Sequence, residues 1–265
     1  QVQVVPDLVP PRRQVAARES HQGVDDGQDR DARQQDEVER ACFAGQHGPG
    51  LQVVEQRVRL ERLGVGWVYL SPILQAAPGS THGYDDVDPS KVDDERGGRE
   101  ALERFAAKAR ELGLGVLVDI VPNHMGVDTP RDNPWWWDVL AHGRDAAHAE
   151  SFDIDWEAGD GKLLIPTVGD DDMPRERGDA IANVTVDREA GVLRYHSTEY
   201  PLAEGSAPEG ASVREVLDNQ HYQLIHWRQG DSRLNYRRFF AVTSLAGIRV
   251  EDDEVFEEAH AEILD

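Results

Sequence analysis

The chain has 265 residues, of which 39% are hydrophobic, enough to build a substantial core in one large domain or two smaller ones. Asp and Glu number 51 against 28 Lys and Arg, and the formal net charge of −23 argues against a basic surface for nucleic acid or an anionic membrane. The single cysteine, Cys42, cannot form an internal disulfide, and no apolar run approaches the roughly 20 residues that cross a bilayer. Because no secretory apolar segment lies near the N-terminus either, these features predict a cytoplasmic protein.

Residues 1–56 differ in composition from the rest of the chain. They hold ten of the 14 Gln, whereas all six Trp and all six Tyr lie at or beyond Trp67. The segment has no sustained hydrophobic period of a helix or a strand, so it is a poor core former. We expect it to be disordered or to be a gene-boundary artefact, with the folded region beginning near residue 57.

Alternating strands and helices are expected from about residue 57. Two apolar, β-prone runs, residues 66–72 and 114–122, each stop at a proline, which is typical of strands buried on both faces. A polar loop is expected over residues 75–94, followed by a helix over residues 97–112 that ends at Gly113. Strand, helix and strand at this spacing predict a right-handed parallel unit of an α/β protein.

The regularity fades after Asn123 for about ninety residues. Two short strands with a turn at Gly191 are expected within residues 182–195, and helices are expected over residues 213–229 and 253–264. An insertion of this length after a strand is too long for an ordinary connection, so it is expected to be a subdomain or a functional lid.

Polar side chains gather where the second predicted strand ends. Asp119 lies inside the apolar run, and a buried carboxylate needs a charged or hydrogen-bonding partner. Asn123 and His124 follow it, and ligand sites of parallel α/β proteins lie at the carboxyl ends of strands. The alternative is that Asp119 caps a neighbouring loop and His124 is a loop histidine with satisfied hydrogen bonds.

The loop after the first predicted strand carries a second set of candidates, His82 and Tyr84, followed by Asp85. An aromatic ring flanked by His and Asp suits a sugar, which has an apolar C–H face and hydroxyls that need polar partners. The alternative for a Gly-Tyr-Asp sequence is a plain turn.

Five strings in the sequence resemble a known enzyme family: SPIL (71–74), GSTHGYD (79–85), DIVPNH (119–124), NPWWWD (133–138) and LNYRRFF (234–240). Together they resemble the maltooligosyltrehalose synthases, members of the α-amylase superfamily of barrel glycosidases. The resemblance runs from about residue 57 to the C-terminus, and nothing in residues 1–56 matches the family's first strand and helix.

The resemblance implies roles for the candidate residues. Tyr84 would stack beneath the sugar in the reacting subsite, with His82 beside it, and His124 would hydrogen-bond the sugar hydroxyls. Asp119 would hold an arginine of the family's next conserved strand. Asn123 occupies the position of a calcium ligand in some amylases, but the other oxygen ligands of such a site are not identifiable, so no metal and no cofactor are expected.

The implied fold is an incomplete (β/α)8 TIM-type barrel with a long inserted subdomain after the strand that ends near Asp119. The expected divisions are the non-matching residues 1–56, the first part of the barrel at 57–124, the inserted subdomain at 125–230, and a return toward the barrel at 231–265. The family converts the reducing-end α-1,4 linkage of maltooligosaccharides to an α,α-1,1 linkage, which makes a trehalose end. The expected partner is therefore a maltooligosaccharide and not a nucleic acid or a membrane.

This reaction requires a carboxylate nucleophile and a carboxylic acid about 5 to 5.5 Å apart. Glu251, two residues after Arg249, has the spacing of the superfamily's nucleophile, but its flanking residues resemble an earlier family segment. We therefore expect no catalytic residue within the chain, and expect both carboxylates beyond Asp265. Two alternatives stay open, an α-amylase-like glucan hydrolase and a non-catalytic glucan-binding fragment.

Two further motifs have a structural and a functional interpretation. Three adjacent Trp residues, 135–137, cannot all share one helix or strand face, so at least one ring is expected to pack inward. For the others, core packing of the inserted subdomain and contact with glucan stay open as alternatives. Arg237 and Arg238 would either bind substrate hydroxyls or pair with some of the many acidic side chains.

Overall fold

The computed structural model describes residues 2–3, 65–176 and 179–264. The chain divides into two compact units, unit 1 with Gln1–Ile73 and Arg96–Ile120 and unit 2 with Leu74–Glu95 and Val121–Asp265, and each is described by itself. The expectation for residues 1–56 lies outside the described residues, apart from the short strand β1 (Val2–Gln3).

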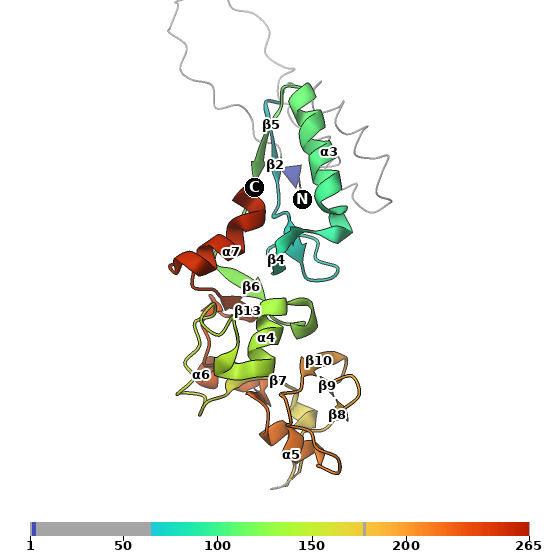
Figure 1. Cartoon of the computed structure of the whole chain (residues 1–265), viewed down its shortest axis with the longest axis vertical. Coiled ribbons are helices and arrows are strands. Elements are labelled where there is room, and N and C mark those ends of the chain that lie inside the picture. Colours follow the sequence, from blue (N-terminus) through green and yellow to red (C-terminus); the bar gives the residue numbers. More distant parts are fainter. Residues whose placement is uncertain (1, 4–64, 177–178, 265) are drawn as a thin grey trace, which may run out of the picture. The chain divides into compact units, whose positions relative to one another are not determined.

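Unit 1 is a small sheet with a helix beside it (Figure 1). The strand order is β1-β2-β5, where β2 is Trp67–Leu70 and β5 is Gly115–Val118, and β2 pairs with β5 in parallel. Helix α3 (Gly98–Glu111) directly precedes β5 in the chain and packs on it. Gly113, at φ +68°, has the left-handed conformation that ends a helix. The predicted parallel strand–helix–strand unit is thus confirmed.

The prediction that both strands are buried on both faces is wrong. Trp67 in β2 is 51% exposed and Leu117 in β5 is 50% exposed. Among the described residues of unit 1, α3 is the helix that packs on this sheet. An apolar, β-branched run favours a strand, but burial of both its faces requires elements that cover both sides of the sheet.

Unit 2 holds most of the described strands and helices (Figure 1). Its strands are β3 (Leu74–Ala76), β4 (Asp86–Val92), β6 (His124–Gly126), β7 (Leu163–Val168), β8 (Val184–Asp187), β9 (Val192–Tyr195), β10 (Thr198–Pro201), β11 (Tyr222–His226), β12 (Arg238–Phe239) and β13 (Val242–Gly247). Its α-helices are α4 (Pro134–His142), α5 (Val213–Asp218), α6 (Gly230–Arg233) and α7 (Asp253–Leu264). Short 3-10 segments are η1 (Asp94–Arg96), η2 (Pro130–Asp132), η3 (Gly143–Asp145), η4 (Asp170–Asp172) and η5 (Trp227–Gln229). Within the described parts of the chain, no helix has both the length and the hydropathy to cross a membrane.

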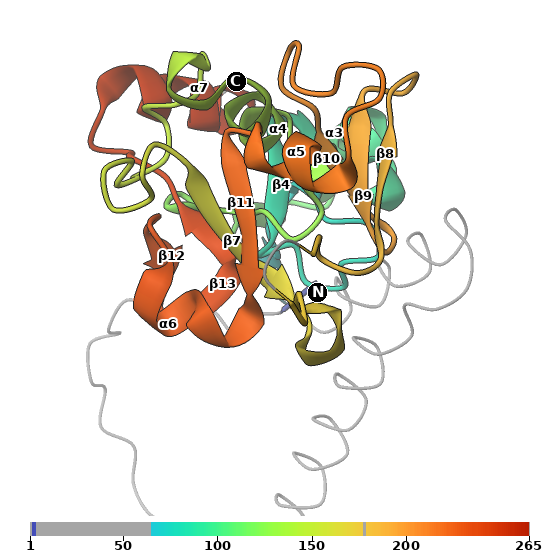
Figure 2. The same cartoon turned by 90° about the horizontal axis from the view of Figure 1, so that it is seen from below.

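Four small sheets organise unit 2. One has the order β12-β13-β6 and another the order β10-β9-β8, both antiparallel, and β3 pairs with β4. The fourth is the parallel pair β7–β11, and Figure 2 shows α5 between β11 and the β8–β10 sheet. Helix α7 packs on β4. Segments far apart in the sequence are therefore neighbours in two of the four sheets, β7–β11 and β12-β13-β6.

Several sequence-based expectations for unit 2 are confirmed and two are wrong. Strands β8 and β9 with a turn at Gly191 (φ +68°), and helix α7 over Asp253–Leu264, agree with the prediction. The helix expected over 213–229 ends at Asp218, and its second half is β11, because residues 222–226 pair with β7 far away in the sequence. The segment expected to be a loop over 75–94 instead forms most of a local antiparallel pair, because β3 and β4 hydrogen-bond to each other.

The main core surrounds α4. Asn133 caps this helix by accepting the N–H of Trp136 at 2.9 Å, and Pro134 occupies the first turn, where its missing N–H costs nothing. Trp136 is 1% exposed and packs edge-to-face against Phe152 and Tyr236 at ring separations of 4.9 and 5.2 Å. Asn133 and Pro134 thus set where α4 begins, and this start directs the Trp136 indole toward the core.

Candidate functional site

His124, the first residue of β6, lies at the centre of the candidate residues of unit 2. Its Nδ1 is 2.8 Å from Oδ1 of Asn123, and its Nε2 is 2.9 Å from the backbone carbonyl oxygen of Tyr84. The side chain is 5% exposed. Both ring nitrogens therefore contact protein groups, and a sugar hydroxyl that bonded either one would have to displace its present partner.

The loop that carries Tyr84 is held against β6. A Cβ added at Gly126 would lie 2.9 Å from the carbonyl oxygen of Asp85, so only glycine permits this close approach of the two backbones. Within the loop, the Ser80 hydroxyl donates to the Asp85 carboxylate at 2.5 Å, and the N–H of Tyr84 donates to Nδ1 of His82 at 3.0 Å. These contacts fix the backbone that presents the Tyr84 ring.

The Tyr84 ring is available at the surface. It is 43% exposed, and the His82 ring is partly stacked on it at a centroid distance of 5.9 Å. The structure thus brings together four of the five predicted site residues, namely His82, Tyr84, Asn123 and His124.

Phe239 and Phe240 adjoin the site and were not among the predicted residues. Phe239 stacks on the His124 ring at 4.1 Å, and Phe240 is 84% exposed at φ +51°. The two side chains, with Asn123, Arg237, Arg238 and Gly247, line a cavity of about 190 Å³. The LNYRRFF string contains both residues, as two aromatic side chains after two cationic ones. Nothing in the string indicates that these side chains lie beside His124.

The protonation of His124 follows from its surroundings. Burial lowers the pKa of His124 from its ordinary value, against smaller opposing effects of the Tyr84 carbonyl and the Asp85 charge. A neutral imidazole has one N–H, and at Nε2 that hydrogen donates to the Tyr84 carbonyl. Nδ1 is then an acceptor, which requires Asn123 to turn its NH2 group toward the ring. A protonated ring would instead donate to Oδ1 of Asn123.

Asp119, the fifth predicted residue, lies in unit 1 at the end of β5. Its N–H donates to the carbonyl oxygen of Leu70 at 2.9 Å, and its Oδ1 accepts the N–H of Ile120 at 3.0 Å. The side chain is half-buried. The backbone bond continues the β2–β5 pairing, and the role of Asp119 toward a ligand stays a prediction.

The arginine pair contacts acidic groups and a backbone carbonyl. Nε of Arg237 is 3.0 Å from the Asp153 carboxylate, and its Nη2 donates to the carbonyl oxygen of Ile248 at 3.0 Å. Arg238 pairs with Asp231 at 2.7 Å. Both arginines also line the 190 Å³ cavity. A guanidinium has five N–H donors, so each arginine retains N–H groups beyond those used in these contacts.

The tryptophan cluster has mainly a structural role. Trp135 and Trp136 are 4% and 1% exposed, and Trp135 stacks on His148 at 4.9 Å. Trp137 is half-buried with the Arg131 guanidinium 4.9 Å above its ring. Of the three rings, Trp137 therefore retains the accessible surface.

Glu251 lies in an exposed turn between β13 and α7. The strand before this turn, β13, runs antiparallel to β6, with Gly247 opposite His124. In a (β/α)8 barrel all strands are parallel, and catalytic residues follow their carboxyl ends. Nearby Arg249 pairs with Glu150 at 2.7 Å instead of lying beside Glu251 on a strand. This environment is unlike that of a barrel nucleophile.

The site as a whole offers neutral and cationic hydrogen-bond donors beside aromatic rings. The ring of Tyr84 and the rings of Phe239 and Phe240 supply apolar surface, and the two arginines supply donors. Across the described ranges there is no group of three or more His, Cys, Asp or Glu side chains placed to hold a metal ion. The chemistry available here is that of binding polyhydroxylated molecules.

Known proteins resemble the chain over most of its length. Residues 46–152 match the family model for the catalytic domain of alpha amylase, a match that begins ahead of residue 57. A Mycobacterium tuberculosis (strain ATCC 25618 / H37Rv) protein named as a maltooligosyl trehalose synthase is 50% identical over 204 residues, 77% of this chain and 25% of that protein. The chain is a relative of the maltooligosyl trehalose synthases.

Solved structures agree. The maltooligosyltrehalose synthase of Arthrobacter ramosus is 51% identical with a TM-score of 0.72, and the match covers 78% of this chain and 26% of that one. The hypothetical maltooligosyl trehalose synthase of Sulfolobus tokodaii is 38% identical with a TM-score of 0.67, covering 80% of this chain and 28% of that one. The chain thus spans about a quarter of the relatives' length, and the α/β fold of the amylase catalytic domain is confirmed.

Proposed function

We propose that this chain is part of a maltooligosyltrehalose synthase, an intramolecular transglycosylase that converts the reducing-end α-1,4 linkage of maltooligosaccharides to an α,α-1,1 linkage. The observation that carries the proposal is the 50% identity over 204 residues to a maltooligosyl trehalose synthase. The aromatic and hydrogen-bonding groups around His124 support a sugar ligand.

The proposed architecture is part of a (β/α)8 barrel with an inserted subdomain. The parallel pair β2–β5, with α3 as its crossover, has the form of one repeat of such a barrel. Residues 125–230 would form the inserted subdomain and residues 231–265 the return toward the barrel. The mixture of small antiparallel and parallel sheets in residues 124–247 supports an insertion, because barrel repeats would alternate parallel strands with helices.

The proposed glucose subsite uses the Tyr84 ring as its platform, with His82 at its edge. We assign His124 to this subsite through its contact with the Tyr84 carbonyl, which positions the loop, and Asn123 through its place in the cavity beside Phe240. Asp119 is proposed to hold an arginine of the family's next conserved strand.

We further propose that no carboxylate of this chain acts as the nucleophile or the acid. The exposed turn of Glu251, after a strand antiparallel to β6, supports this. A retaining mechanism needs two carboxyl groups about 5 to 5.5 Å apart, flanking the scissile bond. The full reaction would then require residues that the 265-residue chain does not supply.

One experiment tests the activity of the chain. The purified 265-residue chain is incubated with maltopentaose, and its products are separated by chromatography, with a full-length maltooligosyltrehalose synthase as the positive control. We expect neither a trehalose-ended product nor shorter reducing sugars. Trehalose-ended product would overturn the absence of catalytic carboxylates, and shorter reducing sugars would instead favour an α-amylase-like hydrolase.

A non-catalytic glucan-binding role is the second candidate, favoured by the exposed Tyr84 ring beside an anchored loop. Calorimetric titration of the chain with maltopentaose measures it. We expect Tyr84→Ala to weaken binding by about tenfold, the value of a stacked aromatic contact. The control is Trp227→Ala, which removes an exposed aromatic ring outside the Tyr84 loop and should leave the affinity unchanged. Tyr69→Ala is not used, because Tyr69 lies in strand β2. Equal affinity of the Tyr84→Ala variant and the wild type would reject the subsite.

A further inference from the structure

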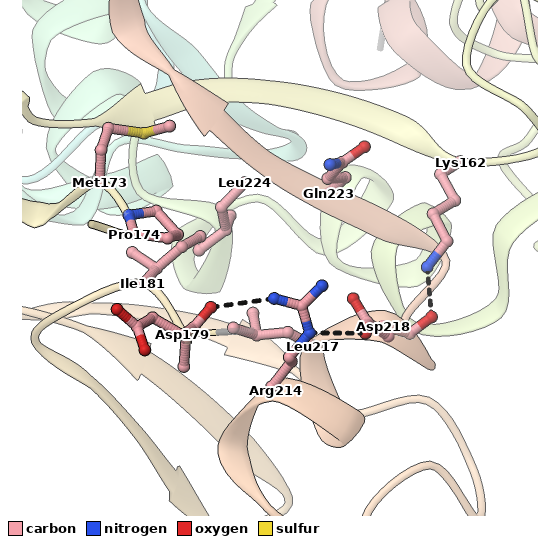
Figure 3. A pocket seen from close by; sticks show the side chains of 11 residues that line it. Lys162, Met173, Pro174, Asp179, Ile181, Arg214, Leu217, Asp218, Gln223 and Leu224 are labelled. Atoms are coloured by element: carbon pink, nitrogen blue, oxygen red, sulfur yellow. Dashed lines mark hydrogen bonds and ion pairs between the residues drawn. The ribbon is translucent and has the colours of Figure 1, made fainter. Parts of the chain in front are cut away.

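We infer that unit 2 holds a second carbohydrate-binding site, a pocket of about 500 Å³ between β11, α5 and residues 173–174 and 179–181 (Figure 3). This volume falls within the range of small-molecule sites and suits about two or three sugar rings. In Figure 1, α5 and β4 lie at opposite ends of unit 2, so the pocket is separate from the Tyr84 loop that precedes β4.

The rim of the pocket is cross-linked by hydrogen bonds and an ion pair. The Lys162 ammonium group donates to the backbone carbonyl oxygens of Asp218 at 2.6 Å and Gln220 at 2.8 Å, which ties β7 to the end of α5. Arg214 donates to the backbone carbonyl oxygen of Asp179 at 3.0 Å, and its Nε lies 3.5 Å from the Asp218 carboxylate (Figure 3). The pocket walls are therefore joined across the opening before any ligand binds.

The charges of the rim select a neutral ligand. Two cationic side chains, Lys162 and Arg214, face two anionic ones, Asp179 and Asp218. Burial lowers the pKa of Lys162 from its usual range, and the Asp218 charge opposes that shift. An anion would meet two carboxylates, and a cation would meet an ammonium and a guanidinium, so neither gains a net Coulombic advantage.

The remaining hydrogen-bonding groups match hydroxyls. Lys162 and Arg214 retain N–H groups beyond those used in the contacts above, and the Gln223 side chain makes no hydrogen bond with the described residues. These donors stand beside carboxylate and amide acceptors, and a hydroxyl both donates and accepts. The wall between them is aliphatic, with Leu224 and Ile181, and suits the C–H faces of sugar rings (Figure 3).

The lining of the pocket indicates a ligand with many hydroxyls, whereas the choice of an α-1,4-glucan as the ligand rests on the proposed function.

The two methionines of the chain separate the sites experimentally. Met173 lines the pocket and is 38% exposed, whereas Met125 lies next to His124 in β6 and is 2% exposed. Methyl-labelled methionine in the 265-residue chain therefore gives one NMR signal for each site, assigned with the variant Met173→Leu.

The test is a titration with maltotriose, followed through the two methyl signals. We expect the Met173 signal to move with concentration equally in the wild type and in Tyr84→Ala. Gln223→Ala removes an exposed amide from the pocket and should weaken the Met173 response about fivefold, the contribution of one hydrogen bond. The matched control, Gln229→Ala, makes the same change in η5 outside the pocket and should leave the response unchanged.

Each other outcome has a defined meaning. A Met173 signal that maltotriose leaves unmoved at tens of millimolar, or one that moves alike in wild type and Gln223→Ala, overturns the pocket as a sugar site. Movement with inorganic pyrophosphate but not with maltotriose overturns the charge argument. If Tyr84→Ala loses the Met125 response and keeps the Met173 response, both sites are supported. If the wild type shows a Met173 response but no Met125 response, the result counts only against the proposed Tyr84 subsite.

Discussion

Replacement of Asn133 tests how the main core supports the site. The Asn133 side chain is fully buried, accepts the N–H of Trp136 at 2.9 Å, and donates to the carbonyl oxygen of Gly126 at 2.9 Å. It therefore joins the start of α4 to β6, the strand that begins with His124.

The Gly126 carbonyl has no alternative partner in the β6–β13 ladder. The N–H of Val127 donates to Ser244, and that of Ile248 donates to Asn123, so hydrogen-bonded pairs fall at alternate positions. Gly126, opposite Leu245, occupies the non-hydrogen-bonded position between them. Without Asn133, this buried oxygen loses its hydrogen bond to the side chain.

We expect Asn133→Ala to lower the free energy of unfolding by about 2 to 4 kcal/mol. Loss of the helix cap accounts for about 1 kcal/mol, and the unsatisfied Gly126 carbonyl adds about 1 to 3 kcal/mol. Urea unfolding of the 265-residue chain, followed by Trp fluorescence, measures the change. Ser212→Ala is the control, because Ser212 caps the exposed helix α5 without a second buried contact and should cost about 1 kcal/mol. Equal costs for the two variants would refute the reasoning.

Asn133→Asp separates the two contributions. The new carboxyl group keeps the acceptor for Trp136 but, when ionised, turns a second oxygen toward the Gly126 carbonyl. Burial raises its folded-state pKa, so the folded state binds more protons than the unfolded state, and stability recovers as the pH falls. A variant with the same deficit relative to wild type at pH 5 and pH 7.5 would contradict this account.

Three further predictions concern the site and the core. Because burial lowers the folded-state pKa of His124, its contribution to stability is present above the unfolded value of about 6.5 and is lost as the pH falls below it. Urea midpoints at pH 7.5 and 5.5 should therefore differ more for the wild type than for His124→Gln, and an equal difference would rule this contribution out. Trp136→Ala should lower the free energy of unfolding by about 3 to 5 kcal/mol and Trp137→Ala by about 1 kcal/mol, because the core encloses only the Trp136 indole. Urea unfolding distinguishes the two variants, and a larger loss of stability at Trp137 would contradict the assignment. Phe240→Gly should change stability by less than about 1 kcal/mol, since relief of the φ of +51° offsets the flexibility of glycine, while weakening maltotriose binding severalfold. Calorimetry checks the binding, and unaltered affinity would exclude the 190 Å³ cavity from the glucan site.

The sequence predicted those parts of the fold that depend on local pattern. The apolar spacing of residues 97–112 gave α3, and two β-prone runs on either side gave a parallel pair. The same reasoning failed for residues 222–226, because their strand conformation is fixed by β7, which lies more than fifty residues earlier. Pairing with a distant partner leaves no local signal, so helix and strand could not be distinguished there.

The site was predictable to a similar extent. The rule that ligand-binding loops follow the carboxyl ends of strands predicted Tyr84 near His124, and the 2.9 Å contact between Nε2 of His124 and the Tyr84 carbonyl oxygen joins them. The stacking of Phe239 on His124 was not predictable, because it depends on the β12-β13-β6 sheet that returns the chain after more than a hundred residues. The contribution of Asp119 to the site stays a prediction.

That returning sheet has a consequence for the order in which the molecule folds. The ring of His124 is held by partners forty residues before it and more than one hundred residues after it. Loop closure over such separations is slow compared with helix formation, so α4 and α7 are expected to form before these contacts do. During synthesis on the ribosome, the binding surface would be assembled only after Gly247 has left the exit tunnel. Only then can β13 pair with β6 beside His124.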